Sequence, residues 1–192
     1  MTGRTHDMAA FTALTVIVVT QVIPHVTLAT GITAVVANLV GGITPDIDQP
    51  TAPFWKNLPI GRYVGRTFDK FLGGHRFLSH SIVGVVLFGF AFHYLLQVLK
   101  PSFPHLNMDV IWWSFIIGYA SHLIMDTFTT EGVPWFLPIP IKLGFPPIKS
   151  LRIQTGGLIE RFVIFPGLML VTIYFIYSNY DKVKIILHSY LK

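Results

Sequence analysis

Two histidines flank an arginine in one short segment, His75-Arg76-Phe77-Leu78-Ser79-His80-Ser81, which separates a basic loop from a long apolar run. Neutral imidazole is the commonest metal ligand among side chains. A chain that is 52% hydrophobic has little reason to place two imidazoles at the boundary of an apolar run unless something binds there. The segment therefore predicts a binding site, with His75 and His80 as its first candidate metal ligands.

Two further segments offer carboxylates at spacings that suit a metal. His122 and Asp126 are separated by one helical turn, so both side chains leave the same face of a helix. They can share one ion, or Asp126 can orient the imidazole through a hydrogen bond. Asp46 and Asp48 alternate after Pro45, and alternate side chains of an extended chain point the same way. Two such carboxylates suit bridged cations, because without a cation one of them would be driven to take up a proton.

This ligand set favours particular metals and a particular chemistry. Histidine and carboxylate ligands without sulfur suit zinc, manganese or iron better than calcium, and the chain has no cysteine. Two or three such ions would activate water at neutral pH and stabilise an in-line displacement at phosphorus. Arg76, between the two histidines, is placed to hold a phosphate oxygen. We expect two or three divalent ions, zinc in the first place and manganese as the alternative.

The composition is that of an integral membrane protein. Only 12% of the residues are charged, against about 25% in typical soluble domains, and the mean hydropathy is +0.60. The chain has no basic, aromatic-interleaved module of the kind that binds nucleic acid, so we expect no such partner. We predict an all-α, single membrane-embedded domain over residues 1–192. Its helical bundle has about five transmembrane helices, at residues 7–23, 26–43, 79–99, 110–128 and 159–177.

Three connecting segments are less regular. Residues 60–72 form either a short basic helix on the membrane surface or an irregular loop. The loop at 133–147 is rich in proline and glycine and too broken to span a membrane. It either dips into the membrane interface or caps a site. The tail from Asp181 is basic and mildly amphipathic.

The five spans predict an orientation. Most lysines and arginines fall on the side of the N-terminus, which places that side in the cytoplasm, although the lysines of the tail oppose this assignment. The same topology brings all the ligand candidates to the cytoplasmic face of the inner membrane. These candidates are His6, Asp46, Asp48, His75, His80, His122, Asp126 and Glu160.

Each candidate also has an ordinary structural explanation. Asp46 follows a proline, which is common turn chemistry, and His122 with Asp126 would make a buried structural pair. Glu160 would favour the positive end of a helix dipole, and Arg76 would serve as topological charge. Their coincidence on one face is harder to explain in this way, because ionisable residues at membrane depth are functional candidates by default.

At these residues the chain resembles the YdjM-type family of membrane-bound, metal-dependent hydrolases. The resemblance covers roughly residues 5–165, and Ser79 stands where the family commonly has threonine. The family is in turn distantly similar to the zinc phospholipase C and P1 nuclease group, whose helical enzymes hold three zinc ions and include a His-x3-Asp/Glu element. The matching segments are Thr5-His6, Pro45-Asp46-Ile47-Asp48, His75 to Ser81, Gly118 to Thr127, and Thr155-Gly156-Gly157 with Glu160.

The resemblance implies phosphoester hydrolysis by a zinc cluster. The predicted substrate is a lipid phosphoester, because a site at headgroup depth beside Arg62, Arg66 and Lys70 is placed to receive an anionic headgroup. Arg76, Asp48 and Glu160 are the candidate catalytic residues. The candidate metal ligands are His6, Asp46, Asp48, His75, His80, His122 and Asp126.

Two other functions stay open. A divalent-metal transporter or sensor would use the same ligand types, although the ligands of a transporter typically lie near the bilayer midplane. A structural membrane protein with a metal staple would show metal-dependent stability and no activity.

Overall fold

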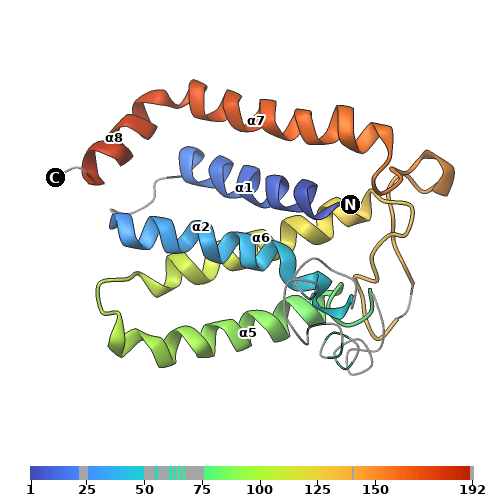
Figure 1. Cartoon of the computed structure of the whole chain (residues 1–192), viewed down its shortest axis with the longest axis horizontal. Helices are drawn as coiled ribbons and strands as arrows, with labels where there is room; N and C mark the ends of the chain where they lie inside the picture. The colour runs from blue at the N-terminus through green and yellow to red at the C-terminus, as the bar shows by residue number, and fades with distance from the viewer. Residues whose placement is uncertain are drawn as a thin grey trace.

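The computed structural model describes residues 1–21, 26–49, 76–139 and 141–190, together with positions 55, 61, 63, 65 and 67. Within these residues the chain is almost wholly helical, and its only β-type contacts are two isolated bridges, Thr129 with Ile153 and Val133 with Leu143. The long helices lie side by side and alternate in direction along the chain (Figure 1). They are α1 (Gly3–Thr20), α2 (Leu28–Ile43), α5 (Ile82–Leu99), α6 (Met108–Thr127) and α7 (Phe165–Ser178), followed by α8 (Tyr180–Tyr190).

The predicted all-α membrane bundle is confirmed. Four helices in the described part of the chain are long and apolar enough to cross a membrane. α1 fails that test although it packs within the bundle, because Arg4, His6 and Asp7 lie in its first turns. The four spans are Leu28–Asp48, Ile82–Ser102, Met108–Thr127 and Glu160–Ser178.

Local sequence explains where these helices begin and end. The Ser81 hydroxyl accepts a hydrogen bond from the Gly84 amide and caps α5, and the Asn107 side chain caps α6 by accepting from the amides of Asp109 and Val110. α2 continues into the 3-10 helix η1 (Thr44–Asp48), where Pro45 occupies the first turn. Proline is tolerated there because first-turn amides have no partner within the helix.

The tightest contact in the bundle joins α2 to α6. Gly118 of α6 lies so close to α2 that an added Cβ would overlap the carbonyl oxygen of Asn38, and Gly41 of α2 meets the carbonyl oxygen of Phe115 in the same way. Small residues let the backbones of membrane helices approach closely. The Asn38 side chain also donates to the Ser114 carbonyl oxygen (3.1 Å). This contact sets where the C-terminal turns of α6 lie.

Chain direction brings five segments to one end of the bundle. α1 and α5 begin there, α2 and α6 end there, and α7 follows the short π-helical segment η4 (Glu160–Ile164) that begins there, on the side of the N-terminus in Figure 1. We call this the metal-centre end. The spans predicted from sequence match these helices to within a few residues.

Two local expectations need comment. Asp46 and Asp48 were expected on extended chain, and this is wrong, because both lie in η1. Pro45 can begin a helix as well as end one, and α2 runs into η1 without a break. The surface helix predicted at residues 60–72 falls mostly outside the described residues, and the positions described between 61 and 67 are helical.

Candidate metal centre

Imidazoles and carboxylates from four elements converge at the metal-centre end. His6 comes from α1, the two aspartates from η1, His80 from the turn before α5, and His122 with Asp126 from the last turns of α6. All but Asp46 are almost completely buried, whereas the Asp46 side chain is 24% exposed. Burying so many ionisable groups costs free energy unless they are paired or bind a cation.

His122 occupies the centre of this group. Its Nδ1 lies 2.6 Å from the carbonyl oxygen of Gly42 in α2. A carbonyl oxygen only accepts, so Nδ1 must carry the proton, and the Nε2 of the neutral ring keeps its lone pair. That Nε2 is buried, has no hydrogen-bond partner in the described part of the chain, and lies 3.7 Å from an oxygen of Asp46 and 3.7 Å from one of Asp126.

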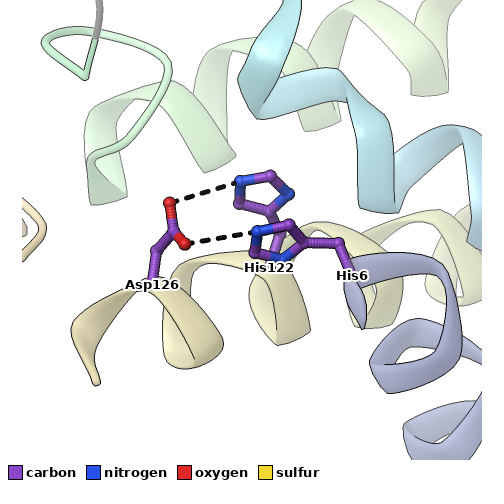
Figure 2. A group of neighbouring side chains, drawn as sticks. All are labelled: His6, His122 and Asp126. Carbon is purple, nitrogen blue, oxygen red and sulfur yellow. Dashed lines mark ion pairs between the residues drawn. The ribbon is translucent and has the colours of Figure 1, made fainter. Parts of the chain in front are cut away.

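His6 and Asp126 complete a first triad with His122, shown in Figure 2. The two imidazoles stack with their ring centroids 3.6 Å apart. One oxygen of Asp126 lies 3.2 Å from Nε2 of His6, while the other faces His122. The carboxylate thus bridges two stacked rings that come from helices far apart in sequence.

Asp46 and His80 form a second triad with the same His122. The Nε2 of His80 lies 3.9 Å from Oδ1 of Asp46 and 3.7 Å from Oδ2 of Asp126. Burial lowers the pKa of His80, which lies just before the span of α5, below its ordinary value. The ring is therefore neutral, as a metal ligand must be.

Asp48 lies behind His80. Its Oδ2 accepts hydrogen bonds from the Arg76 amide (2.9 Å) and from the Ser79 hydroxyl. The same oxygen lies 3.4 Å from Nδ1 of His80. A carboxylate in this position fixes the orientation of an imidazole and makes its other nitrogen a stronger ligand. Asp48 therefore orients His80 toward Asp46 and Asp126.

Arg76 contacts the same oxygen of Asp126 that faces His80 and His122. One guanidinium nitrogen lies 2.6 Å from Oδ2 of Asp126, and another donates to the Thr129 hydroxyl (3.1 Å). Nε lies 3.4 Å from the exposed carboxylate of Glu131. The Arg76 backbone has a φ of 58°, an uncommon conformation for a residue with a side chain. Such strain persists only where surrounding contacts enforce it.

Glu160 lies at the edge of the site and is bound on both oxygens. Oε1 accepts hydrogen bonds from the Thr2 amide (2.6 Å), the Thr2 hydroxyl (2.7 Å) and the Thr5 hydroxyl (2.6 Å). Oε2 accepts from the Gly156 amide (2.7 Å). Glu160 thereby ties the first turn of α1 to the segment before α7. The same turn carries the Met1 amino group, which contacts Oδ1 of Asp126.

The structure thus brings together all the candidate residues that it describes, with Asp48 and Glu160 around the two triads; His75 lies outside the described residues. Sequence reasoning missed three contributors: the Gly42 carbonyl oxygen, the Thr2 and Thr5 hydroxyls, and Glu131. Backbone carbonyls carry no sequence signal, and the threonines begin a helix where capping is their ordinary role.

A divalent ion fits both triads. Zinc binds nitrogen and oxygen ligands at about 2.0–2.2 Å, which places two ligands of a tetrahedral ion about 3.3 Å from each other. The ligand atoms of each triad lie within 4.8 Å of one another, and the nitrogen–oxygen separations given above are of the required order. The buried Nε2 of His122 faces two carboxylates and has no hydrogen-bond partner among the described residues, as a metal ligand requires, and sulfur is absent from the donor set.

Comparisons with known proteins identify relatives of the chain. The chain is 28% identical over 178 residues to YvsG of Bacillus subtilis (strain 168), described only as an uncharacterized protein; this alignment covers 92% of the chain and 95% of YvsG. It is 30% identical over 122 residues to the inner membrane protein YdjM of Escherichia coli (strain K12), an alignment that covers 63% of the chain and 56% of YdjM. No solved structure matches the chain.

A family comparison covers nearly the whole sequence. The profile described as "YdjM inner membrane protein" matches residues 1–185, which include every candidate ligand. Together with the four candidate spans, this match supports a multi-pass protein of the inner membrane. The chain belongs to the YdjM inner membrane protein family.

Proposed function

We propose that the chain is a membrane-bound, metal-dependent hydrolase that cleaves a phosphoester of a lipid or lipid-linked substrate at the cytoplasmic face. The observation that supports this most directly is the position of His122. Its Nε2, which has no hydrogen-bond partner in the described part of the chain, faces two carboxylates and belongs to both triads. This Nε2 can bind one ion, and the two oxygens of Asp126, which face different histidines, can bridge that ion to a second one.

The contacts of each residue indicate whether it would bind a metal ion or exchange a proton. His122 would bind one ion together with Asp46 and His80, and the two oxygens of Asp126 would bridge that ion to a second one held by His6. Bound divalent ions would lower the pKa of water toward neutrality and stabilise charge developing on phosphate oxygens. Asp46 is the partly exposed carboxylate of the group, so substrate would enter past it, and its second oxygen, Oδ2, would take a proton.

Arg76 would bind the phosphate. Its guanidinium lies between the buried Asp126 and the exposed Glu131, at the boundary between the ligand cluster and solvent. A planar guanidinium binds phosphate through two parallel hydrogen bonds, which a lysine cannot reproduce. The φ of 58° at Arg76 is consistent with backbone strain kept for function.

Asp48 and Glu160 would act by positioning. Both accept several hydrogen bonds and neither is exposed, so they are poorly placed to exchange protons with substrate. Asp48 orients His80, and Glu160 holds the turn that carries His6. This assignment refines the catalytic roles predicted for them from sequence.

The test is a metal and turnover measurement on the full chain purified in detergent. We expect bound zinc or manganese, and hydrolysis of phospholipid or lipid phosphate that a chelator abolishes and added metal restores. Absence of bound metal would contradict the proposal. Bound metal without turnover of any phosphoester would favour a metal transporter, a sensor or a structural staple.

Substitution of Arg76 by lysine separates phosphate binding from metal binding. R76K keeps the charge beside Asp126 but loses the bidentate geometry, so we expect metal content to be retained and turnover to fall about 10- to 100-fold, the value of one or two charged hydrogen bonds. The matched control is R152K, because the hydrogen bonds of Arg152 within the described residues go to the carbonyl oxygens of Pro146 and Pro147, in the loop between α6 and α7. Equal turnover in the two variants would refute the role of Arg76.

A further inference from the structure

The connection between α6 and α7 exposes several large apolar side chains. We call residues 134–151 the proline loop. Phe136 is 59% exposed and Leu151 is 65% exposed. Each large apolar side chain left in water forgoes about 1.5–3 kcal/mol of burial free energy, and contiguous apolar patches mark interaction sites. The exposed side chains are Phe136, Ile139, Ile141, Leu143, Phe145, Ile148 and Leu151.

This exposure is built into the loop. Val133 and Leu143 exchange two backbone hydrogen bonds (2.8 and 2.9 Å), and the Phe145 amide donates to the Thr127 carbonyl oxygen at the end of α6 (2.8 Å). Arg152 donates to the Pro146 carbonyl oxygen (2.7 Å). These bonds hold the backbone in one arrangement, so the apolar side chains are presented outward.

The position of the loop indicates what covers it. It leaves the span of α6 after Thr127 and returns to the span that begins at Glu160, so both of its ends lie where the chain meets the membrane surface. Its base also reaches the metal centre, because Arg76 donates to Thr129 and to the Gly132 carbonyl oxygen. The nearest apolar medium for the exposed side chains is therefore the bilayer that the adjoining helices cross.

The composition of the loop suits the headgroup region. Two exposed lysines, Lys142 and Lys149, alternate with the apolar side chains, as in segments that lie in the plane of an anionic membrane. Unsatisfied backbone amides are costly near lipid. Five prolines, which have no amide hydrogen, reduce that cost: Pro134, Pro138, Pro140, Pro146 and Pro147.

We propose that the proline loop is a membrane-interface anchor at the metal-centre end. Its apolar side chains insert at the boundary between headgroups and acyl chains, and Lys142 and Lys149 bind the phosphates of anionic lipids. The loop thereby holds the metal centre at headgroup depth. This proposal depends on the membrane spans and not on hydrolase activity, so either can fail without the other.

The chain lacks cysteine, which allows a direct depth measurement. Single variants F136C and I148C carry an environment-sensitive fluorophore in vesicles of equal parts phosphatidylcholine and phosphatidylglycerol. Three nitroxide quenchers are compared: water-soluble, attached at the lipid headgroup, and attached at mid-chain. F90C is the reference, because Phe90 lies midway along α5 and is 70% exposed on the bundle surface.

We expect headgroup nitroxides to quench both loop positions severalfold more strongly than the water-soluble one, while F90C is quenched best by mid-chain nitroxides. Quenching of the loop positions mainly from water would overturn the proposal. So would protection from all three quenchers together with disulfide cross-linking between copies, which would mean that a second chain covers the loop.

The lysines are tested separately. Charge reversal in K142E with K149E is expected to reduce headgroup quenching at F136C in the anionic vesicles and to leave it unchanged in pure phosphatidylcholine. Helix content measured by circular dichroism checks that the variant is folded. Identical quenching before and after charge reversal in anionic vesicles would mean that the two lysines do not contribute to membrane binding of the loop.

Discussion

The side chains between the helices are polar at one end of the bundle and apolar at the other. At the metal-centre end, α1, α2 and α6 bury imidazoles and carboxylates against one another. At the other end, the same three helices and α8 line a half-open apolar pocket of about 670 Å³. Its lining includes Leu14 and Ile17 of α1, Val35 of α2, Trp113 of α6 and Ile185 of α8. The lining at this end is mostly apolar, so the polar interior at the metal-centre end is not a general property of these helices and needs another reason.

Histidines at the two ends sharpen this contrast. His93 in α5 is half-buried, lies 3.3 Å from the Gln97 amide nitrogen, and meets the Trp112 ring edge-on. His105 is exposed beside Phe103. Both have ordinary contacts at a helix surface or loop. His80 and His122 are fully buried and face carboxylates, so burial with carboxylates distinguishes a ligand from an interfacial histidine.

Replacement of His122 by alanine is expected to have the largest effect. Both triads lose the ligand that they share, so metal affinity should fall by more than about 100-fold, beyond the 10–100-fold typical of losing an outer partner. H93A is the matched control from the other end and should bind metal as the parent chain does. Metal content after purification and a competition titration measure the difference. Normal metal binding by H122A would mean that the buried histidine at the metal-centre end is no more a metal ligand than His93 at the other end.

Packing at the metal-centre end is expected to be the next most sensitive feature. In G118A the added methyl group would overlap the Asn38 carbonyl oxygen, so α2 and α6 must separate. We expect a loss of about 3 kcal/mol in the free energy of unfolding, the upper part of the range for overpacking. The control is G3A, since no atom lies within 4 Å of a methyl group added there. Thermal unfolding in detergent compares the two, and equal stabilities would mean that the helix contact is looser than described.

A substitution at Asp48 tests whether a hydrogen-bond partner of a metal ligand affects metal affinity. In D48N the side chain keeps its shape but loses the charge that orients His80, so metal affinity should fall about 10- to 100-fold. D109N is the control, because Asp109 is exposed in the first turn of α6 at the opposite end. Competition with a metal-binding dye measures both affinities. Unchanged affinity in D48N would mean that its contact with Nδ1 of His80 does not support ligation.

Much of this arrangement was predictable because helices that alternate in direction constrain where side chains lie. Apolar runs of spanning length, interrupted near Pro24, Pro45 and Pro101, set the number and direction of the helices. Once direction was assigned, residues near the ends of successive helices had to meet. Asp46 and His122, which are distant in sequence, were placed at one end for this reason alone.

The roles of individual atoms were not predictable, because they depend on contacts between helices. The spacing of His122 and Asp126 indicated a shared ion, but only the approach of Gly42 shows which ring nitrogen is protonated. The left-handed backbone of Arg76 has no sequence signal in a non-glycine residue. The Thr2 and Thr5 groups that bind Oε1 of Glu160 lie at the other end of the chain, so the residue resembled an ordinary helix start.

The smallest predicted effect compares one substitution at two positions of α2. Ala34 lines the apolar pocket, whereas Ala37 lies in the packed core against α6, and both are 5% exposed. Valine at either position changes helix propensity equally, so the difference in stability reports local packing alone. At Ala34 the added methyl groups enter free space, and at Ala37 they compress the core. We therefore expect A37V to be less stable than A34V by about 1–2 kcal/mol, measured by thermal unfolding in one detergent. If A34V were the less stable variant, the pocket would be filled in the folded protein, and the two ends would differ in chemistry but not in packing.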